Sequence, residues 1–173
     1  MLDTIRYMLD PDRAERRQAG GERELLEWFL EFQRDTLLWK LNGLTREQLT
    51  AMHTPSGMSL LGLLKHLAYV ERNWFQIRFL GVPLSVPWRT DDPDADFRIE
   101  PDETAESVLD FYAREVGESR RILSDTRSLD ELSQTGDPLR SMRWIMIHMI
   151  EETARHAGHA DFMREFTDGQ TGE

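Results

Sequence analysis

Apolar residues recur every three or four positions in four long stretches of the chain, with polar residues between them. This period places the apolar side chains on one face of an α-helix. Turn-forming residues separate the stretches, and serine or acidic residues stand where a helix start needs an acceptor or a negative charge. The pattern predicts four long helices, over residues 22–42, 59–80, 102–124 and 141–166.

The connections between these helices differ in character. Thr45 and Gln48 have the spacing of a capping box, which predicts a short helix after the first long one. Residues 83–101 are rich in Pro and Asp and show no durable period, so we expect an extended crossover loop there. Its acidic run, residues 91–96, lacks the glycine and terminal glutamate of an EF-hand loop, and we interpret it as a solvated loop.

These elements predict an all-α fold, an antiparallel four-helix bundle with a long crossover between its second and third helices. Residues 1–20 lack a sustained apolar period and end at a Gly-Gly pair, so we interpret them as an N-terminal arm. Residues 21–173 then form one bundle domain, which agrees with a total length of 173 residues.

Composition narrows the classes of function. A formal net charge of -11 without a basic block argues against binding to nucleic acid or to an anionic membrane surface. The chain has no cysteine, which excludes disulfides, thiolate ligands and a cysteine nucleophile. Neither a signal peptide nor a membrane span is recognisable, so we expect a cytoplasmic protein.

The last predicted helix carries a stripe of ionisable residues. At about 100° per residue, His148, Glu152, His156 and His159 fall within about 80° of one another. Glu152 and His156 are four positions apart, so both side chains can reach one metal ion. On residue pattern alone, an ordinary surface pair is an equal alternative, and His148 or His159 can simply be exposed.

A third ligand must come from another helix. His66 lies in an apolar stripe of the second predicted helix, where it is either a ligand or a hydrogen-bonded core histidine. Bundle metalloproteins hold ions with carboxylates and imidazoles that point inward from facing helices. Two imidazoles and one carboxylate suit zinc, nickel, iron or manganese, with positions left for water or substrate.

Several longer motifs resemble the DinB-like superfamily, and specifically its actinobacterial branch of mini-circle-type proteins. The resemblance covers nearly the whole chain, and it is carried by Gly43-Leu44-Thr45, residues 55–67, residues 70–75, Asp94-Ala95-Asp96-Phe97 and residues 148–161. It implies a four-helix bundle whose metal is bound by one histidine of the second helix and two residues one turn apart on the last.

In many relatives both last-helix ligands are histidines, whereas relatives that isomerise maleylpyruvate with mycothiol have a glutamate first. The resemblance therefore implies His66, Glu152 and His156 as ligands, with zinc preferred over nickel, iron or manganese. It leaves His148 and His159 as catalytic acid-base candidates.

The reaction implied by the resemblance is attack of a metal-activated low-molecular-weight thiol on a small electrophile, as in an S-transferase or isomerase. Two alternatives stay open: a metal-dependent hydrolase, in which the ion activates water, and a non-enzymatic bundle that binds a metal or a partner. A homodimer is compatible with such a bundle. The substrate, the reaction and the role of the metal do not follow from the sequence.

Overall fold

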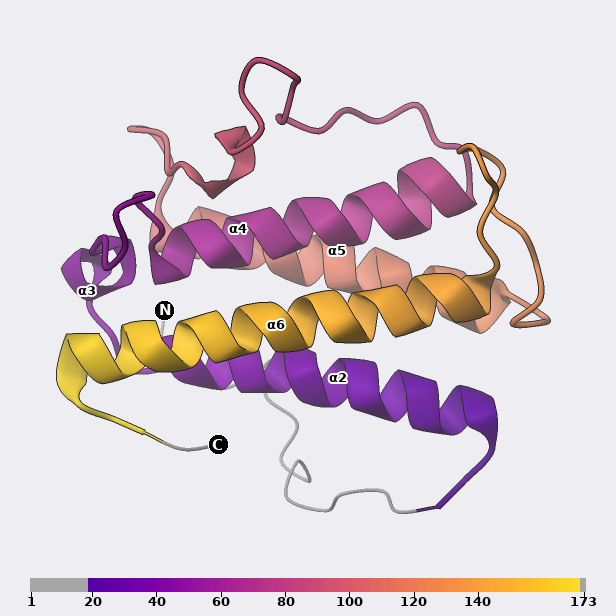
Figure 1. Cartoon of the computed structure of the whole chain (residues 1–173), viewed down its shortest axis with the longest axis horizontal. Coiled ribbons are helices and arrows are strands. Elements are labelled where there is room, and N and C mark those ends of the chain that lie inside the picture. Colours follow the sequence, from indigo (N-terminus) through magenta and orange to yellow (C-terminus); the bar gives the residue numbers. More distant parts are fainter. Residues whose placement is uncertain (1–18, 172–173) are drawn as a thin grey trace.

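The computed structural model describes residues 19–171 and confirms the all-α bundle (Figure 1). Residues 1–18 of the expected N-terminal arm lie outside the described part. Between residues 19 and 171 there is no β-strand, only two isolated bridges. The helical elements are α2 (Glu22–Leu41), α3 (Arg46–Thr50), α4 (Leu60–Glu71), the π-helix η1 (Arg72–Phe79), the 3-10 turn η2 (Ala95–Phe97), α5 (Ala105–Asp125) and α6 (Met142–Asp168).

The four long helices form two packed pairs, α2 with α6 and α4 with α5 (Figure 1). Within each pair the helices run in the same direction. Arg143 near the start of α6 pairs with Glu22 at the start of α2, and Lys65 of α4 pairs with Glu103 just before α5. The long crossover explains this direction, because it returns the chain to the starting end of α4 before α5 begins. The sequence-based description as antiparallel therefore holds between the pairs and not within them.

Capping residues set the helix boundaries. The third long helix begins at Ala105, not near residue 102, because Thr104 accepts a hydrogen bond from the Ser107 amide at 3.0 Å. The Ser107 hydroxyl in turn accepts a hydrogen bond from the Thr104 amide at 2.9 Å, which completes a capping box. At the other end of the chain, α6 continues to Asp168 and ends at Gly169, whose φ of 78° suits a residue without a side chain.

The second long helix changes its winding part-way. It is α-helical to Glu71 and π-helical from Arg72 to Phe79, which the apolar pattern did not predict. Arg72 and Gln76 of the π-helical part both donate to the carboxylate of Glu115 on α5, at 2.7 Å and 2.6 Å. These charge-assisted bonds tie the wider turns to the neighbouring helix.

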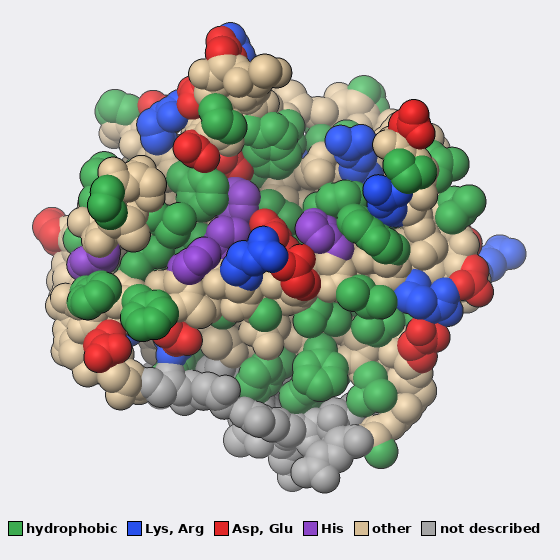
Figure 2. All heavy atoms as spheres, in the orientation of Figure 1, with side chains coloured by type: hydrophobic (Ala, Val, Ile, Leu, Met, Phe, Trp, Pro, Cys, Tyr) green, Lys and Arg blue, Asp and Glu red, His purple; other side chains and the backbone are tan. Residues whose placement is uncertain are grey.

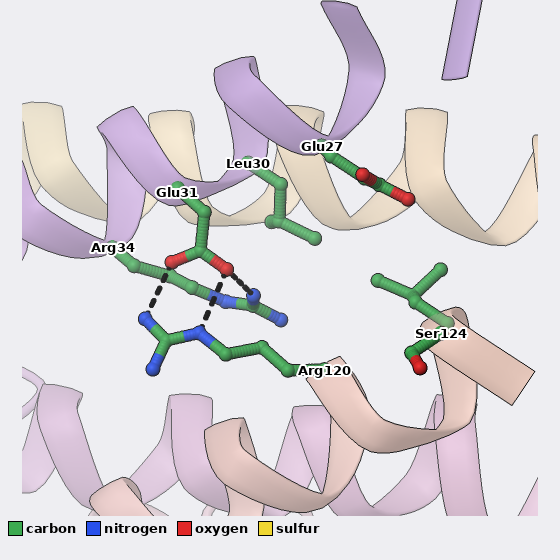
Figure 3. Close-up of a pocket in the computed structure, with 7 residues that line it drawn as sticks. Glu27, Leu30, Glu31, Arg34, Arg120 and Ser124 are labelled. Carbon is green, nitrogen blue, oxygen red and sulfur yellow. Dashed lines mark hydrogen bonds and ion pairs between the residues drawn. The ribbon is translucent and has the colours of Figure 1, made fainter. Parts of the chain in front are cut away.

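The core contains a buried ion pair. Arg34 of α2 donates two hydrogen bonds to Glu71, at 2.8 Å and 2.7 Å, and both side chains are 2% exposed. Glu31 accepts from Arg34 and also from Arg120 of α5 (Figure 3). A pocket of about 220 Å³ opens beside this network, between α2 and α5. Because each charged side chain in its wall has an ion-pair partner, we interpret the network as structural.

Leucine dominates the rest of the interior. One apolar cluster joins α2, α3, α4, α5 and the C-terminal half of α6. The other joins α2, the end of α4, η1, the end of α5 and the starting half of α6. Together they fix α4 against α6, which brings the histidine of the second helix opposite the ionisable stripe of the last. None of the helices in residues 19–171 combines the length and the apolar character needed to cross a membrane.

Candidate metal centre

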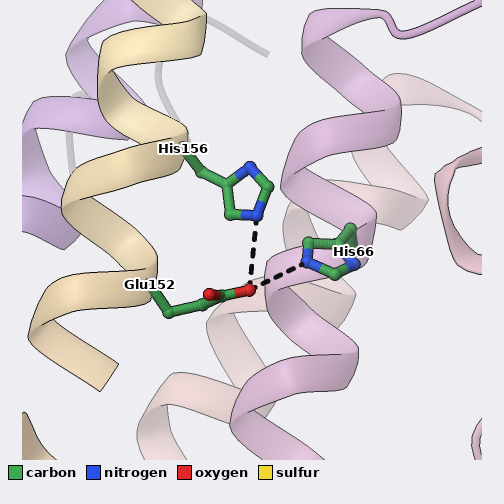
Figure 4. Close-up of side chains that lie close together, drawn as sticks. All are labelled: His66, Glu152 and His156. Carbon is green, nitrogen blue, oxygen red and sulfur yellow. Dashed lines mark ion pairs between the residues drawn. The ribbon is translucent and has the colours of Figure 1, made fainter. Parts of the chain in front are cut away.

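Three side chains from facing helices converge at the middle of the bundle (Figure 4). His66 comes from α4, whereas Glu152 and His156 lie one turn apart on α6. One ligand atom from each of the three residues lies within 4.8 Å of the others. Glu152 Oε1 is 3.5 Å from His66 Nε2 and 3.3 Å from His156 Nε2.

The two separations from Glu152 match the edge of a metal coordination polyhedron, whereas the set as a whole spans up to 4.8 Å. Bonds of about 2.0–2.2 Å at tetrahedral angles place neighbouring ligand atoms about 3.4 Å apart. In addition, His66 Nε2 is buried and makes no hydrogen bond in this structure. A buried ring nitrogen without a partner is costly unless something occupies its lone pair, so the donor set fits a divalent cation.

Asp96 determines which nitrogen of His66 faces the site. The carboxylate of Asp96 is 1% exposed, and its Oδ2 lies 2.6 Å from His66 Nδ1. An ionised carboxylate only accepts, so Nδ1 carries the proton and donates. The lone pair of Nε2 then points toward Glu152 and His156. The ring of Phe97 stacks on His66 at a centroid distance of 4.1 Å and restricts its rotation.

The electrostatics of the three residues are strongly coupled. Contact with His156 first, and with His66 second, holds the pKa of Glu152 far below its ordinary value. Burial opposes protonation of His66, but the carboxylates of Asp96 and Glu152 outweigh it and raise the pKa of that imidazole. The site thus holds a carboxylate that is ionised at neutral pH, beside an imidazole whose protonated form is favoured by the neighbouring carboxylates.

His159 and His148 lie on opposite sides of this group. His159 Nδ1 is 3.4 Å from His156 Nδ1, so His159 can orient that ring from behind. Burial, followed by the charges of His156 and Arg155, lowers the pKa of His159. His148 stands one turn before Glu152, where its ring stacks on Trp144 at 5.1 Å and contacts Trp74 at 4.7 Å.

Comparison with known proteins matches residues 25–169 to the family model described as mycothiol-S-transferase. The chain belongs to the mycothiol-S-transferase family. This confirms the resemblance to DinB-like proteins that the motifs suggested. That description names a thiol, mycothiol, and an S-transfer reaction.

Solved structures support the same fold. The crystal structure described as the conserved protein of locus from Enterococcus faecalis superposes with a TM-score of 0.62. It is 16% identical in sequence, and the match covers 88% of this chain and 100% of that chain. At this identity the likeness shows the fold alone. None of the curated proteins matches the chain.

Asp96 is the residue of the site that sequence reasoning missed. The acidic run 91–96 was interpreted as solvated, and this is wrong for Asp96, which η2 buries against His66. Asp91 of the same run is exposed, as expected, and pairs with Arg89. The signal was the Phe97 that follows Asp96, because an aromatic residue within a polar loop indicates that the loop packs at that point.

Proposed function

We propose that this chain is a metal-dependent thiol S-transferase or isomerase in which His66, Glu152 and His156 hold one divalent cation. Zinc is the preferred ion, with nickel, iron and manganese as alternatives. The observation that carries the proposal is the convergence of three ligand atoms within 4.8 Å, in a chain that belongs to the mycothiol-S-transferase family.

A bound divalent cation supplies Lewis acidity, which lowers the pKa of a thiol beside it and makes thiolate available at neutral pH. Residues of the chain itself position the ligands and exclude water. Asp96 holds the proton on His66 Nδ1 and thereby keeps Nε2 directed into the site. Phe97 covers one face of the imidazole and excludes water from it. No cysteine competes with the external thiol.

His159 is the proposed acid-base residue. His156 faces Glu152 through Nε2, so its Nδ1 carries the proton and donates to His159 Nδ1, which leaves a proton on His159 Nε2. His159 can give this proton to the product or to the leaving group, while the proton of the incoming thiol passes to solvent. The sulfur then forms a bond to the electrophilic carbon, and either a leaving group departs or the carbon framework rearranges and the thiol is released. His148 is the second acid-base candidate, placed to contact the substrate on the Trp144 side.

The first test measures metal in untagged protein by elemental mass spectrometry. We expect close to one zinc per chain in the wild type, and strongly reduced metal in His66→Ala, Glu152→Ala and His156→Ala. His53→Ala is the matched control, because His53 bonds Thr167 and lies outside the three-residue group. A wild type that takes up no metal on reconstitution would refute the site.

The second test separates the reactions. Protein and mycothiol are mixed with 1-chloro-2,4-dinitrobenzene, and the loss of thiol is compared with the formation of the S–C product and chloride. Catalysed loss of thiol that disappears in the ligand variants supports transfer. Rapid cleavage of esters or amides without thiol would indicate a hydrolase instead, and metal without either activity would indicate a binding protein.

A further inference from the structure

A second pocket lies at the end of the bundle where η1 meets the start of α6. It has a volume of about 160 Å³ and is formed by the loop 133–140 together with Trp74 and Arg78 of η1. We call it the arginine pocket, because Arg78 and Arg140 are its two cationic side chains. Pockets that take a whole small-molecule ligand measure about 300–1,000 Å³, so this one suits a single chemical group.

The loop that forms the arginine pocket is held in place by its own hydrogen bonds. The amides of Gln134 and Thr135 donate to the carbonyls of Phe79 and Arg78, at 3.0 Å and 3.1 Å, and so cap the end of η1. The Ser133 hydroxyl accepts from the Arg140 amide at 3.0 Å. These bonds fix the two ends of the loop against η1 and against each other.

The two arginines have no carboxylate partner among residues 19–171, although most arginines there form an ion pair. Arg140 lies over the Trp144 ring at 4.8 Å and donates one hydrogen bond, from Nη1 to the Pro138 carbonyl at 3.1 Å. Its Nε is buried and has no partner. Asp137 also lines the pocket, and no ion pair joins it to either arginine.

Two cationic side chains that line one small pocket repel each other unless an anion compensates them. A guanidinium presents paired N–H donors that match the oxygens of a carboxylate or phosphate, and the unpartnered Nε of Arg140 is one such donor. We propose that the arginine pocket binds the carboxylate or phosphate group of a small ligand that extends toward the metal centre.

Aromatic side chains lie between the arginine pocket and the candidate metal centre. Trp144, His148 and Glu152 follow one another at intervals of four residues on α6, so the tryptophan lies about 12 Å along the helix from the glutamate. The rings of Trp74, Trp144 and His148 contact one another and form an aromatic cluster between the sites. Figure 2 shows histidine and basic side chains exposed on the same face of the molecule. This extension toward the metal rests on the proposed function, whereas anion binding in the pocket does not.

Isothermal titration of the full-length protein tests the proposal with phenyl phosphate, benzoate and benzyl alcohol as probes. We expect saturable binding of at least one anion, about tenfold or more tighter than the neutral alcohol. The phosphate and carboxylate arms identify which oxyanion is preferred. Arg140→Gln and Arg78→Gln should each weaken the anion about tenfold or more, since each removes a charged donor.

Arg114→Gln is the control variant, because Arg114 lies over the Phe111 ring on α5 and is not part of the arginine pocket. Arg78 is exposed, and its replacement leaves the loop hydrogen bonds intact. The Arg78→Gln variant therefore tests the proposal even if Arg140→Gln has a folding defect. Equal binding of the alcohol, no saturable binding of either anion, or unchanged anion affinity in both arginine variants would overturn the proposal. Loss of metal binding by the ligand variants concerns the proposed function alone.

Discussion

Gly62 couples the crossover loop to the candidate metal centre, and replacing it with alanine should damage that centre without touching a ligand. A Cβ at this position would stand 2.1 Å from the carbonyl oxygen of Phe97 and 3.1 Å from Ser59 Oγ. Ordinary contacts begin at 3.4 Å, so the carbonyl must retreat by about 1.3 Å. The Phe97 carbonyl belongs to the backbone of η2, so it can move only if the whole turn moves.

The displacement has a direct consequence for His66. Its hydrogen bond to Asp96 measures 2.6 Å, and a retreat of this size along the bond lengthens it to about 3.9 Å, beyond hydrogen-bonding range. Loss of such an outer partner costs about 10–100-fold in metal affinity. Overpacking adds about 1–3 kcal/mol of destabilisation, which exceeds the ~0.5–1 kcal/mol that alanine gains over glycine within a helix.

The assay is zinc competition against a chromophoric chelator, with urea unfolding measured in parallel. We expect Gly62→Ala to bind zinc at least about tenfold more weakly and to lose about 1–2 kcal/mol of stability. Asp96→Ala should reproduce the loss of affinity. Gly117→Ala, where a Cβ meets nothing within 4 Å, should bind zinc normally and be slightly more stable. A Gly62→Ala protein with wild-type zinc affinity would refute the coupling through η2.

Three further outcomes are expected. Glu71→Ala leaves the buried Arg34 guanidinium without its main partner and should cost about 3–5 kcal/mol in urea unfolding; a loss below 1 kcal/mol would contradict the role of the pair. Burial opposes ionisation of Glu31, but Arg120 and Arg34 outweigh burial and lower the pKa of Glu31. The ionised Glu31 side chain therefore stabilises the folded state fully above its ordinary pKa of 4.5, and this stabilisation is lost as the pH falls through the lowered pKa. The stability difference between wild type and Glu31→Gln should therefore shrink below pH 4.5, and a difference that grows there would reverse the sign. Removing metal with a chelator should lower the melting temperature, and adding zinc should restore it in proportion to RT ln(1 + [L]/Kd); an unchanged midpoint would count against metal binding in the folded state.

The sequence predicted the helices well because their apolar period and caps are local signals. Ser59 and Thr45 mark helix starts in both the pattern and the structure, through hydrogen bonds to Gly62 and Gln48. The pairing of Glu152 with His156 also follows from local spacing. What the pattern could not supply is long-range placement: Asp96 lies thirty positions from His66, and only the path of the crossover brings them together.

Other features escaped prediction for a related reason. The π-helical winding of residues 72–79 leaves the order of apolar and polar residues almost unchanged, so a periodicity argument does not detect it. The direction of α5 relative to α4 depends on where the crossover returns, which composition does not encode. The arginine pocket requires two segments about sixty residues apart, and neither segment alone suggests a binding site.

The π-helical segment also stands between two proposed sites that share one continuous helix. Upstream of Arg72, the angular phase of α4 is set by His66 and the packing of leucines; downstream, the wider turns set the phase of Trp74 and Arg78. Because a π-helical turn holds about one residue more than an α-helical turn, removing one residue from the segment would restore α-helical winding and leave the residues after it close to their present angle relative to His66. The wider winding therefore absorbs the gain or loss of one residue between the two sites, so that the arginine pocket and the metal ligands stay in register.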